Sequence, residues 1–180
     1  MVDELETFLT GIRPTTAPQR SLATVLFTDI VGSTQMAAEF GDHRWRDLIE
    51  THNSLVRRHL STFGGREVDT AGDGFFAVFD GPTRAIRCAQ AILGDVESMG
   101  LRIRAGVHIG ECEIADGKVA GIAVNIGARI SALAEPQQIL VSRTVKDLVA
   151  GSGIGFVDGG THRLKGIPDQ WQVFSVDLPN

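Results

Sequence analysis

The stretch EVDTAGDGFFAVF, residues 67–79, has the pattern of a β-hairpin, because two short runs of strand-forming residues flank Gly72-Asp73-Gly74. Its acids Asp69 and Asp73 are four residues apart, and positions two or four apart on an extended chain share a face. Like charges on one face cost free energy unless a cation lies beside them. The stretch therefore predicts a hairpin whose acids are matched by at least one cation.

The segments around this hairpin predict alternating strands and helices. LATVLFTDI, residues 22–30, is an apolar, β-branched run typical of a central strand that is buried on both faces. One long helix is expected after this strand, with Ser33 or Thr34 as its N-cap and Gly64-Gly65 at its end. The later elements are expected, in chain order, as a helix over residues 82–100 with Pro82 at its start, an alternating, half-buried strand over 101–114, a helix over 119–135, a strand over 138–142, a short helix over 143–151, and closing strands near 161–166 and 171–176.

This order of elements predicts an α+β fold, a ferredoxin-like βαββαβ sandwich with additional C-terminal strands. We expect an antiparallel sheet that carries its helices on one face. Residues 1–20 are expected to be an N-terminal segment, with a short helix in VDELETFLTGI and a linker in RPTTAPQR, so that the domain proper is residues 21–180. A linker at this place predicts attachment to further domains.

The composition, with 43% hydrophobic and 22% charged residues and a net charge of −5, is that of a soluble globular domain. The Lys and Arg residues are scattered, which argues against a nucleic-acid surface. Cys88 and Cys112 form neither a disulfide framework nor a metal-binding spacing, and Cys88 is expected to be a small buried side chain in a reducing compartment. We assign none of the five histidines to catalysis, and we expect His108 to be a strand residue. No apolar run reaches the length of a membrane span and no signal peptide is present, so we expect a cytoplasmic location.

Two acids, Asp29 and Asp73, predict a cation site. Asp29 ends the first predicted strand, and Asp73 lies at the tip of the hairpin. In a ferredoxin-like sheet the first strand is next to the hairpin strands, so these acids can meet although 44 residues separate them. Converging carboxylates suit Mg²⁺ or Mn²⁺, and the backbone amides after Gly32 suit phosphate oxygens, so a nucleoside triphosphate is expected. The simpler alternative is that Asp29 caps a turn and Asp73 is an ordinary hairpin acid.

Six segments carry a resemblance to a known family: LFTDIVGST (26–34), TAGDGFFAVF (70–79), RAGVHIGE (104–111), VNIGARI (124–130), ILVS (139–142) and LKG (164–166). In this order they resemble the catalytic domain of the class III nucleotidyl cyclases, from about Leu22 to Val176. The resemblance implies the class III cyclase type of fold and the conversion of ATP or GTP to the cyclic 3′,5′-monophosphate in signal transduction. A diguanylate cyclase is disfavoured because no GGDEF-like signature is present. A DxDxT phosphatase is disfavoured because Val31 stands where its second Asp would.

The resemblance also implies roles for individual residues. Asp29 and Asp73 would bind two divalent metal ions, Mg²⁺ or Mn²⁺, with the carbonyl of Ile30 assisting. Asn125 would orient the ribose, and Arg129 would neutralise the charge that grows on the α-phosphate. The triphosphate would be held by Gly32, Ser33, Thr34 and Lys165.

Two positions depart from the family's pattern. Typical adenylate cyclases have lysine four residues before the second metal acid and aspartate seven residues before the ribose-orienting asparagine. Here Asp69 and Lys118 stand at these positions, so the pair has its polarity exchanged, and Asp116 is a further acid near the second position. ATP remains the expected substrate. The alternative is GTP, because the guanine edge offers adjacent donors that an acid at position 69 can accept. A second alternative is a catalytically weak nucleotide-binding or dimerisation module.

The resemblance implies a partner as well as a substrate. Cyclases of this family place the metal acids on one subunit and the Asn, Arg and base-reading residues on the other. This chain carries both sets, so we expect a homodimer with two shared active sites.

Overall fold

The computed structural model describes residues 18–179, and every structural statement below concerns this part of the chain. The helix expected in VDELETFLTGI and most of the expected linker lie outside the described residues. The elements are β1 (Gln19–Ile30), α2 (Ser33–Phe40), α3 (Asp42–Phe63), β2 (Arg66–Ala71), β3 (Gly74–Phe79), α4 (Pro82–Glu97), β4 (Ile103–Ala115), β5 (Lys118–Ala120), α5 (Ile122–Leu133), β6 (Ile139–Ser142), α6 (Arg143–Leu148), β7 (Phe156–Arg163) and β8 (Gln170–Val176). Among these helices, none is long and apolar enough to cross a membrane.

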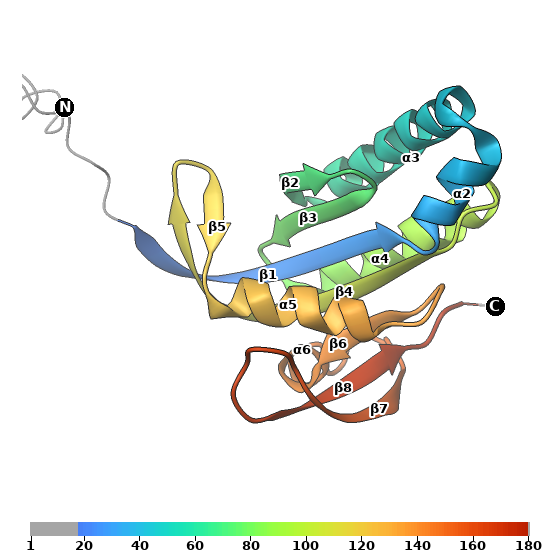
Figure 1. The fold of residues 1–180 in the computed structure, drawn as a ribbon. Coiled ribbons are helices and arrows are strands. Elements are labelled where there is room, and N and C mark those ends of the chain that lie inside the picture. Colours follow the sequence, from blue (N-terminus) through green and yellow to red (C-terminus); the bar gives the residue numbers. More distant parts are fainter. Residues whose placement is uncertain (1–17, 180) are drawn as a thin grey trace, which may run out of the picture.

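The strands form one sheet in the order β2-β3-β1-β4-β6-β8-β7, and β5 pairs with β4 outside this path. β1 is the central strand and runs antiparallel to both β3 and β4. The first four strands of this order are those of a ferredoxin-like sandwich, and β6, β7 and β8 extend it (Figure 1). The predicted α+β class is therefore confirmed. The expectation of a purely antiparallel sheet is wrong at one pair, because β4 and β6 run parallel on either side of the α5 crossover.

Helices cover both faces of the sheet, so the expectation of helices on one face is wrong (Figure 1). Leu26 on β1 belongs to a core cluster with side chains of α3 and α4. Its neighbour Val25 belongs to a second cluster with Ala123 on α5. Because neighbouring residues of a strand point to opposite faces, β1 supplies apolar side chains to both layers. For the same reason residues 105–109 of β4 are all buried, and the predicted half-buried pattern of this strand is wrong.

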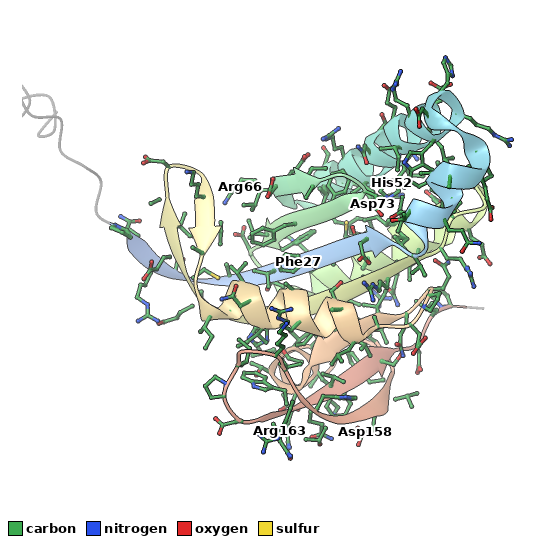
Figure 2. The ribbon with its side chains drawn as sticks, in the orientation of Figure 1. Phe27, His52, Arg66, Asp73, Asp158 and Arg163 are labelled. Atoms are coloured by element: carbon green, nitrogen blue, oxygen red, sulfur yellow. The ribbon has the colours of Figure 1, made fainter. Side chains whose placement is uncertain are left out.

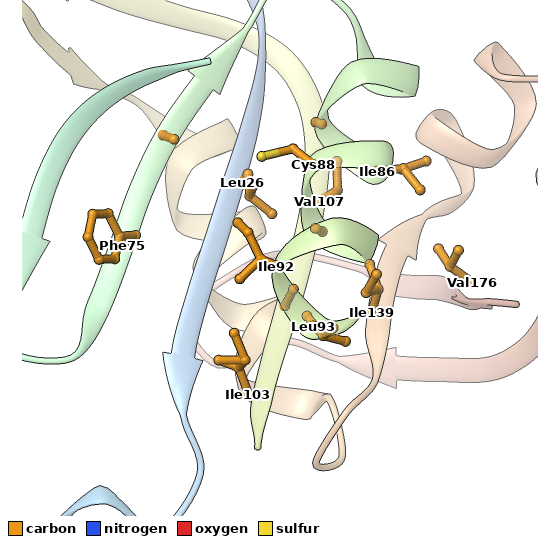
Figure 3. Packing of buried hydrophobic residues seen from close by; sticks show 14 of the residues in the cluster. Leu26, Phe75, Ile86, Cys88, Ile92, Leu93, Ile103, Val107, Ile139 and Val176 are labelled. Carbon is orange, nitrogen blue, oxygen red and sulfur yellow. The ribbon is translucent and has the colours of Figure 1, made fainter. Parts of the chain in front are cut away.

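The larger core lies between the sheet and the pair α3 and α4. Ile92 of α4 packs toward Leu26 and Val107, which lie on neighbouring strands (Figure 3). Cys88 is fully buried in this layer, as predicted. Burial raises the pKa of its thiol to about 12, so this cysteine acts as an apolar side chain.

Helix α5 lies close to the sheet because glycines face it. A Cβ at Gly127 of α5 would be 2.6 Å from Cγ2 of Val25, and a Cβ at Gly110 of β4 would be 2.8 Å from Cβ of Ala123. Real Cβ atoms essentially never come so near another atom. The lack of side chains at these two glycines therefore sets the distance between α5 and the sheet.

Five features of the element boundaries differ from the prediction. The single long helix is two helices, because Gly41 has φ 79° and ψ 160° and breaks the chain between α2 and α3. The N-cap of α2 is Gly32, and no side chain caps it, so the proposed capping by Ser33 or Thr34 is wrong. β1 begins at Gln19, inside the segment predicted as linker. β5 occupies the first residues of the predicted 119–135 helix, and β7 lies earlier than predicted, at Phe156–Arg163.

Candidate active site

The end of β1 and the turn of the β2–β3 hairpin meet at one edge of the sheet. β1 pairs with β3 so that Thr28 lies opposite Phe75, which places Asp29 beside the turn that precedes β3. The backbone amide of Ile30 donates a hydrogen bond of 3.2 Å to Oδ2 of Asp73. A Cβ at Gly74 would lie 3.9 Å from Cβ of Asp29. The structure thus brings Asp29, Ile30 and Asp73 together at the place where the sequence predicts a cation.

Asp29 has a cationic neighbour that the sequence reasoning missed. Nε of Arg104 donates to Oδ1 of Asp29 at 2.8 Å, and Nη2 of Arg104 donates to Oδ2 at 3.0 Å. Donating these hydrogen bonds to the Asp29 carboxylate raises the pKa of Arg104. A third bond, 3.0 Å from Nη1 to the carbonyl of Ala132, holds the guanidinium against the end of α5. Arg104 begins the segment RAGVHIGE, and its only sequence signal is a charge at the start of an apolar strand.

The donors at this edge fit a hard divalent cation. Within the described residues no group of three or more His, Cys, Asp or Glu side chains is arranged to hold a metal ion, so a cation here would depend on Asp29 and Asp73 together with other oxygen ligands. Carboxylate oxygens and the Ile30 carbonyl are the donors that Mg²⁺ and Mn²⁺ prefer. Mg²⁺ commonly keeps several waters and substrate phosphates and takes only one or two carboxylates from the protein. A carboxylate has about four lone-pair sites, and Arg104 occupies one on each oxygen of Asp29, so a cation would either share this carboxylate with Arg104 or displace it.

Asp73 lines a hollow of about 610 Å³ at the start of α2. Ser33 and Thr34 of α2 line the same hollow, together with Trp45 and Arg46 of α3. Because no side chain caps α2, the amides of its first turn are available to an anion. Arg46 is a second cation that the sequence reasoning did not single out.

Asp69 lines a different hollow, of about 280 Å³, which also contains Asp29 and Arg104. The prediction that Asp69 and Asp73 share a face does not hold for the folded hairpin, because Asp73 lies in the turn and Asp69 follows a register shift in β2. Two aromatic rings form one wall of this hollow. Phe27 and Phe76 stack with their centroids 4.5 Å apart and their planes at 6°. The hollow therefore combines an apolar wall with charged groups of both signs.

Asn125, Arg129 and Lys165 meet in a third hollow, of about 480 Å³. Asn125 and Arg129 lie one turn apart on α5, and Lys165 lies in the turn that follows β7. All three side chains are exposed. Ala128 lines both this hollow and the one that contains Asp29, but none of the three polar residues shares a hollow with the acids. A single chain thus presents two groups of predicted site residues in separate places.

Lys118 lies apart from Asp69. It begins β5, at the tip of the β4–β5 hairpin, and lines a fourth hollow with Glu113 and Asp116. The tip of the β4–β5 hairpin contacts β2, since Nη1 of Arg66 donates to the carbonyl of Gly117 at 3.3 Å. No ion pair joins Asp69 and Lys118 among residues 18–179. Within one chain the two residues are therefore apart, and the expected pairing of Asp69 is with Lys118 of a second subunit.

Comparisons with known proteins identify the family of the chain. Residues 16–177 match the sequence model of the family described as adenylate and guanylate cyclase catalytic domain. An adenylate cyclase of Lachancea kluyveri is 32% identical over 168 residues, which cover 76% of this chain and 9% of that protein. A protein of Rhizobium meliloti (strain 1021) is 32% identical over 165 residues, which cover 83% of this chain and 27% of that protein. The chain thus spans about a quarter or less of the length of these two relatives.

Solved structures share the fold. The adenylyl cyclase CyaB from P. aeruginosa superposes with a TM-score of 0.83 at 23% identity, covering 91% of this chain and 97% of that one. The guanylate cyclase domain of RhGC from Catenaria anguillulae, solved in complex with GTP, superposes with a TM-score of 0.80 at 18% identity, covering 90% of this chain and 100% of that one. Proteins named for either substrate therefore have this architecture.

Proposed function

Since the chain belongs to the adenylate and guanylate cyclase catalytic domain family, we propose that it converts ATP to 3′,5′-cyclic AMP and pyrophosphate in signal transduction. The observation that carries the proposal is the meeting of Asp29 and Asp73 at one edge of the sheet, joined through the Ile30 amide. The preference for ATP follows the relative from Lachancea kluyveri, which is named an adenylate cyclase.

Asp29 and Asp73, with the Ile30 carbonyl, would hold divalent ions here. Such ions, when bound, lower the pKa of a coordinated hydroxyl and neutralise phosphate charge. The amides that begin α2 and the ammonium of Lys165 bind phosphate oxygens. Arg129 stabilises the charge that develops on the α-phosphoryl group, where a cation accelerates the step only if it binds the transition state more strongly than the substrate.

The test of this proposal is product formation by the purified chain with Mn²⁺ and either ATP or GTP. We expect cyclic AMP, and we expect Asp29→Asn to lower the rate roughly 100-fold or more because a neutral amide is a poor ligand for a divalent ion. Asparagine retains an oxygen that accepts from Arg104, so the fold should survive, as circular dichroism would show. Failure to form either cyclic nucleotide would leave a nucleotide-binding or dimerisation module as the function.

A homodimer with shared sites is part of the proposal. Its support is that Asp29 and Asp73 line hollows separate from the one that contains Asn125 and Arg129. Mixing Asp29→Asn with Arg129→Ala tests it, because a heterodimer would have one site with both defects and one intact site. With random exchange half of the dimers are heterodimers, so activity should return to about a quarter of the wild-type value. Activity that stays at the level of the separate variants would exclude sites shared in this way.

GTP is the second candidate substrate, favoured by the acid at position 69, which lines the hollow with the aromatic wall. The double variant Asp69→Lys with Lys118→Asp restores the order found in typical adenylate cyclases. We expect it to shift the ratio of kcat/KM values toward ATP by at least about tenfold, because mismatched hydrogen bonds to a base are costly. An unchanged ratio would remove both residues from base recognition.

A further inference from the structure

His52 is a fully buried histidine on α3 whose ring packs against Phe75, two residues after Asp73. Trp45, Ile49 and His52 follow the spacing of one helix face, and the first two line the hollow that contains Asp73. The ring of His52 meets Phe75 edge-on, with centroids 5.9 Å apart and planes at 61°. Figure 2 shows His52 and Asp73 beside each other near the start of α2.

The hydrogen bonding of His52 is incomplete. Nδ1 lies 3.0 Å from Oδ1 of Asn53, and because an amide oxygen accepts, Nδ1 carries the hydrogen and Nε2 offers a lone pair. Nε2 is buried and has no hydrogen-bond partner among the described residues. Burial lowers the pKa of His52, and the negative charge of Asp73 opposes this change. The ring is therefore neutral and within electrostatic reach of the Asp73 carboxylate.

A second polar atom without a partner among the described residues lies in the same layer. Thr28 pairs with Phe75 across β1 and β3, and its side chain has the same parity as Leu26, which faces α3 and α4. Its Oγ1 is buried and has no hydrogen-bond partner in the described part of the chain. Thr28 and His52 thus flank Phe75 below the Asp73 turn. Polar atoms grouped in this way are what a buried water requires, since it makes two to four hydrogen bonds.

We propose that His52 is a positioning residue for Asp73: a buried water donates one hydrogen bond to Nε2 of His52 and the other to the Asp73 carboxylate. This shared water holds the Asp73 turn against α3. The consequence for metal binding rests on the proposed function, in which Asp73 holds a divalent ion. Groups that orient metal ligands in this way commonly change metal affinity by 10- to 100-fold when removed.

The coupling itself is measured without metal. Unfolding of the full chain in EDTA is compared for wild type, His52→Phe, Asp73→Asn and the double variant. We expect the effects to be non-additive by roughly fivefold in the unfolding equilibrium constant, as for residues in one hydrogen-bond network. Additive effects would overturn the proposal. Because no nucleotide or metal is present, this result stands whether or not the chain forms a cyclic nucleotide.

The consequence for the ion is measured with Mn²⁺ alone, by the loss of its free electron paramagnetic resonance signal. We expect His52→Phe to weaken Mn²⁺ binding about tenfold or more, and His52→Gln, whose amide can also accept from a water, to restore it to within about threefold. Thr24→Val is the matched control, because Thr24 is equally buried and its Oγ1 also lacks a partner in the described chain, but it pairs with Phe79 at the far end of the strand. A control that weakens binding as much as His52→Phe, or a glutamine variant that rescues nothing, would overturn the proposal.

Discussion

Replacing Gly127 by alanine tests whether α5 lies as close to β1 as the structure shows. The new Cβ would lie 2.6 Å from Cγ2 of Val25 and 3.2 Å from Cε2 of Phe27, and both residues are held in the central strand. Within a helix alanine is favoured over glycine by about 1 kcal/mol, whereas an extra carbon in a packed core costs about 1–3 kcal/mol. We expect Gly127→Ala to lower the free energy of unfolding by up to about 2 kcal/mol.

Gly94→Ala is the matched control, because Gly94 lies within α4 and a Cβ there would meet no atom within 4 Å. The gain in helix propensity is then unopposed, so this variant should raise the free energy of unfolding by about 1 kcal/mol. The propensity effect is common to both variants, and the difference between them, about 1–3 kcal/mol, isolates the cost of packing. Urea unfolding followed by circular dichroism measures both. Equal changes in the two variants would refute the close approach of α5 to β1.

Three further predictions concern other parts of the chain. Burial lowers the pKa of His108 from 6.5 to about 4, so between these pH values the unfolded chain binds a proton that the folded chain does not. The contribution of neutral His108 to the free energy of unfolding should be fully present above pH 6.5 and should fall by roughly 3 kcal/mol toward pH 4. His108→Gln should flatten this pH dependence in chemical unfolding, and an unchanged slope would contradict the assignment. Ser142→Ala removes the N-cap of α6 and the hydrogen-bond partner of the buried His108 Nδ1, so it should cost at least about 2 kcal/mol in thermal unfolding, whereas Thr144→Ala, at an exposed position of the same helix, should cost much less. Arg104→Met removes a partly exposed ion pair and should lower the free energy of unfolding in EDTA by about 1 kcal/mol. In a thermal-shift assay Mn²⁺ should then stabilise this variant more than wild type, and equal stabilisation would mean that Asp29 does not contact the ion.

The elements that could be predicted from the sequence are those with a local signal. The hairpin follows from Gly72-Asp73-Gly74 between two strand-forming runs, and β1 follows from an apolar, β-branched run. Gly41 was missed as a helix break because a single glycine within a helical pattern is often tolerated. Only its backbone conformation shows that the chain turns there.

The features that could not be predicted depend on pairing between distant strands. Arg104 reaches Asp29 because β1 and β4 pair in a register that puts these two residues opposite each other, and no local pattern encodes that register. The second covered face was missed for a related reason. The sequence predicts the α5 helix, but only the packing of Gly127 against Val25 shows which face of the sheet it covers. The position of Lys118 was likewise not predictable, because it begins β5, a strand of three residues that is too short to leave a pattern in the sequence.

The bidentate pair between Arg104 and Asp29 means that this carboxylate already has a counterion before any solute arrives. An incoming ion must compete with a resident single positive charge that is anchored at both oxygens. Na⁺ or K⁺ offers the carboxylate no more charge than the guanidinium does and lacks its directed bonds, so the exchange brings a monovalent ion no electrostatic advantage. A doubly charged ion does have that advantage. We therefore expect Arg104 to favour divalent over monovalent ions at Asp29.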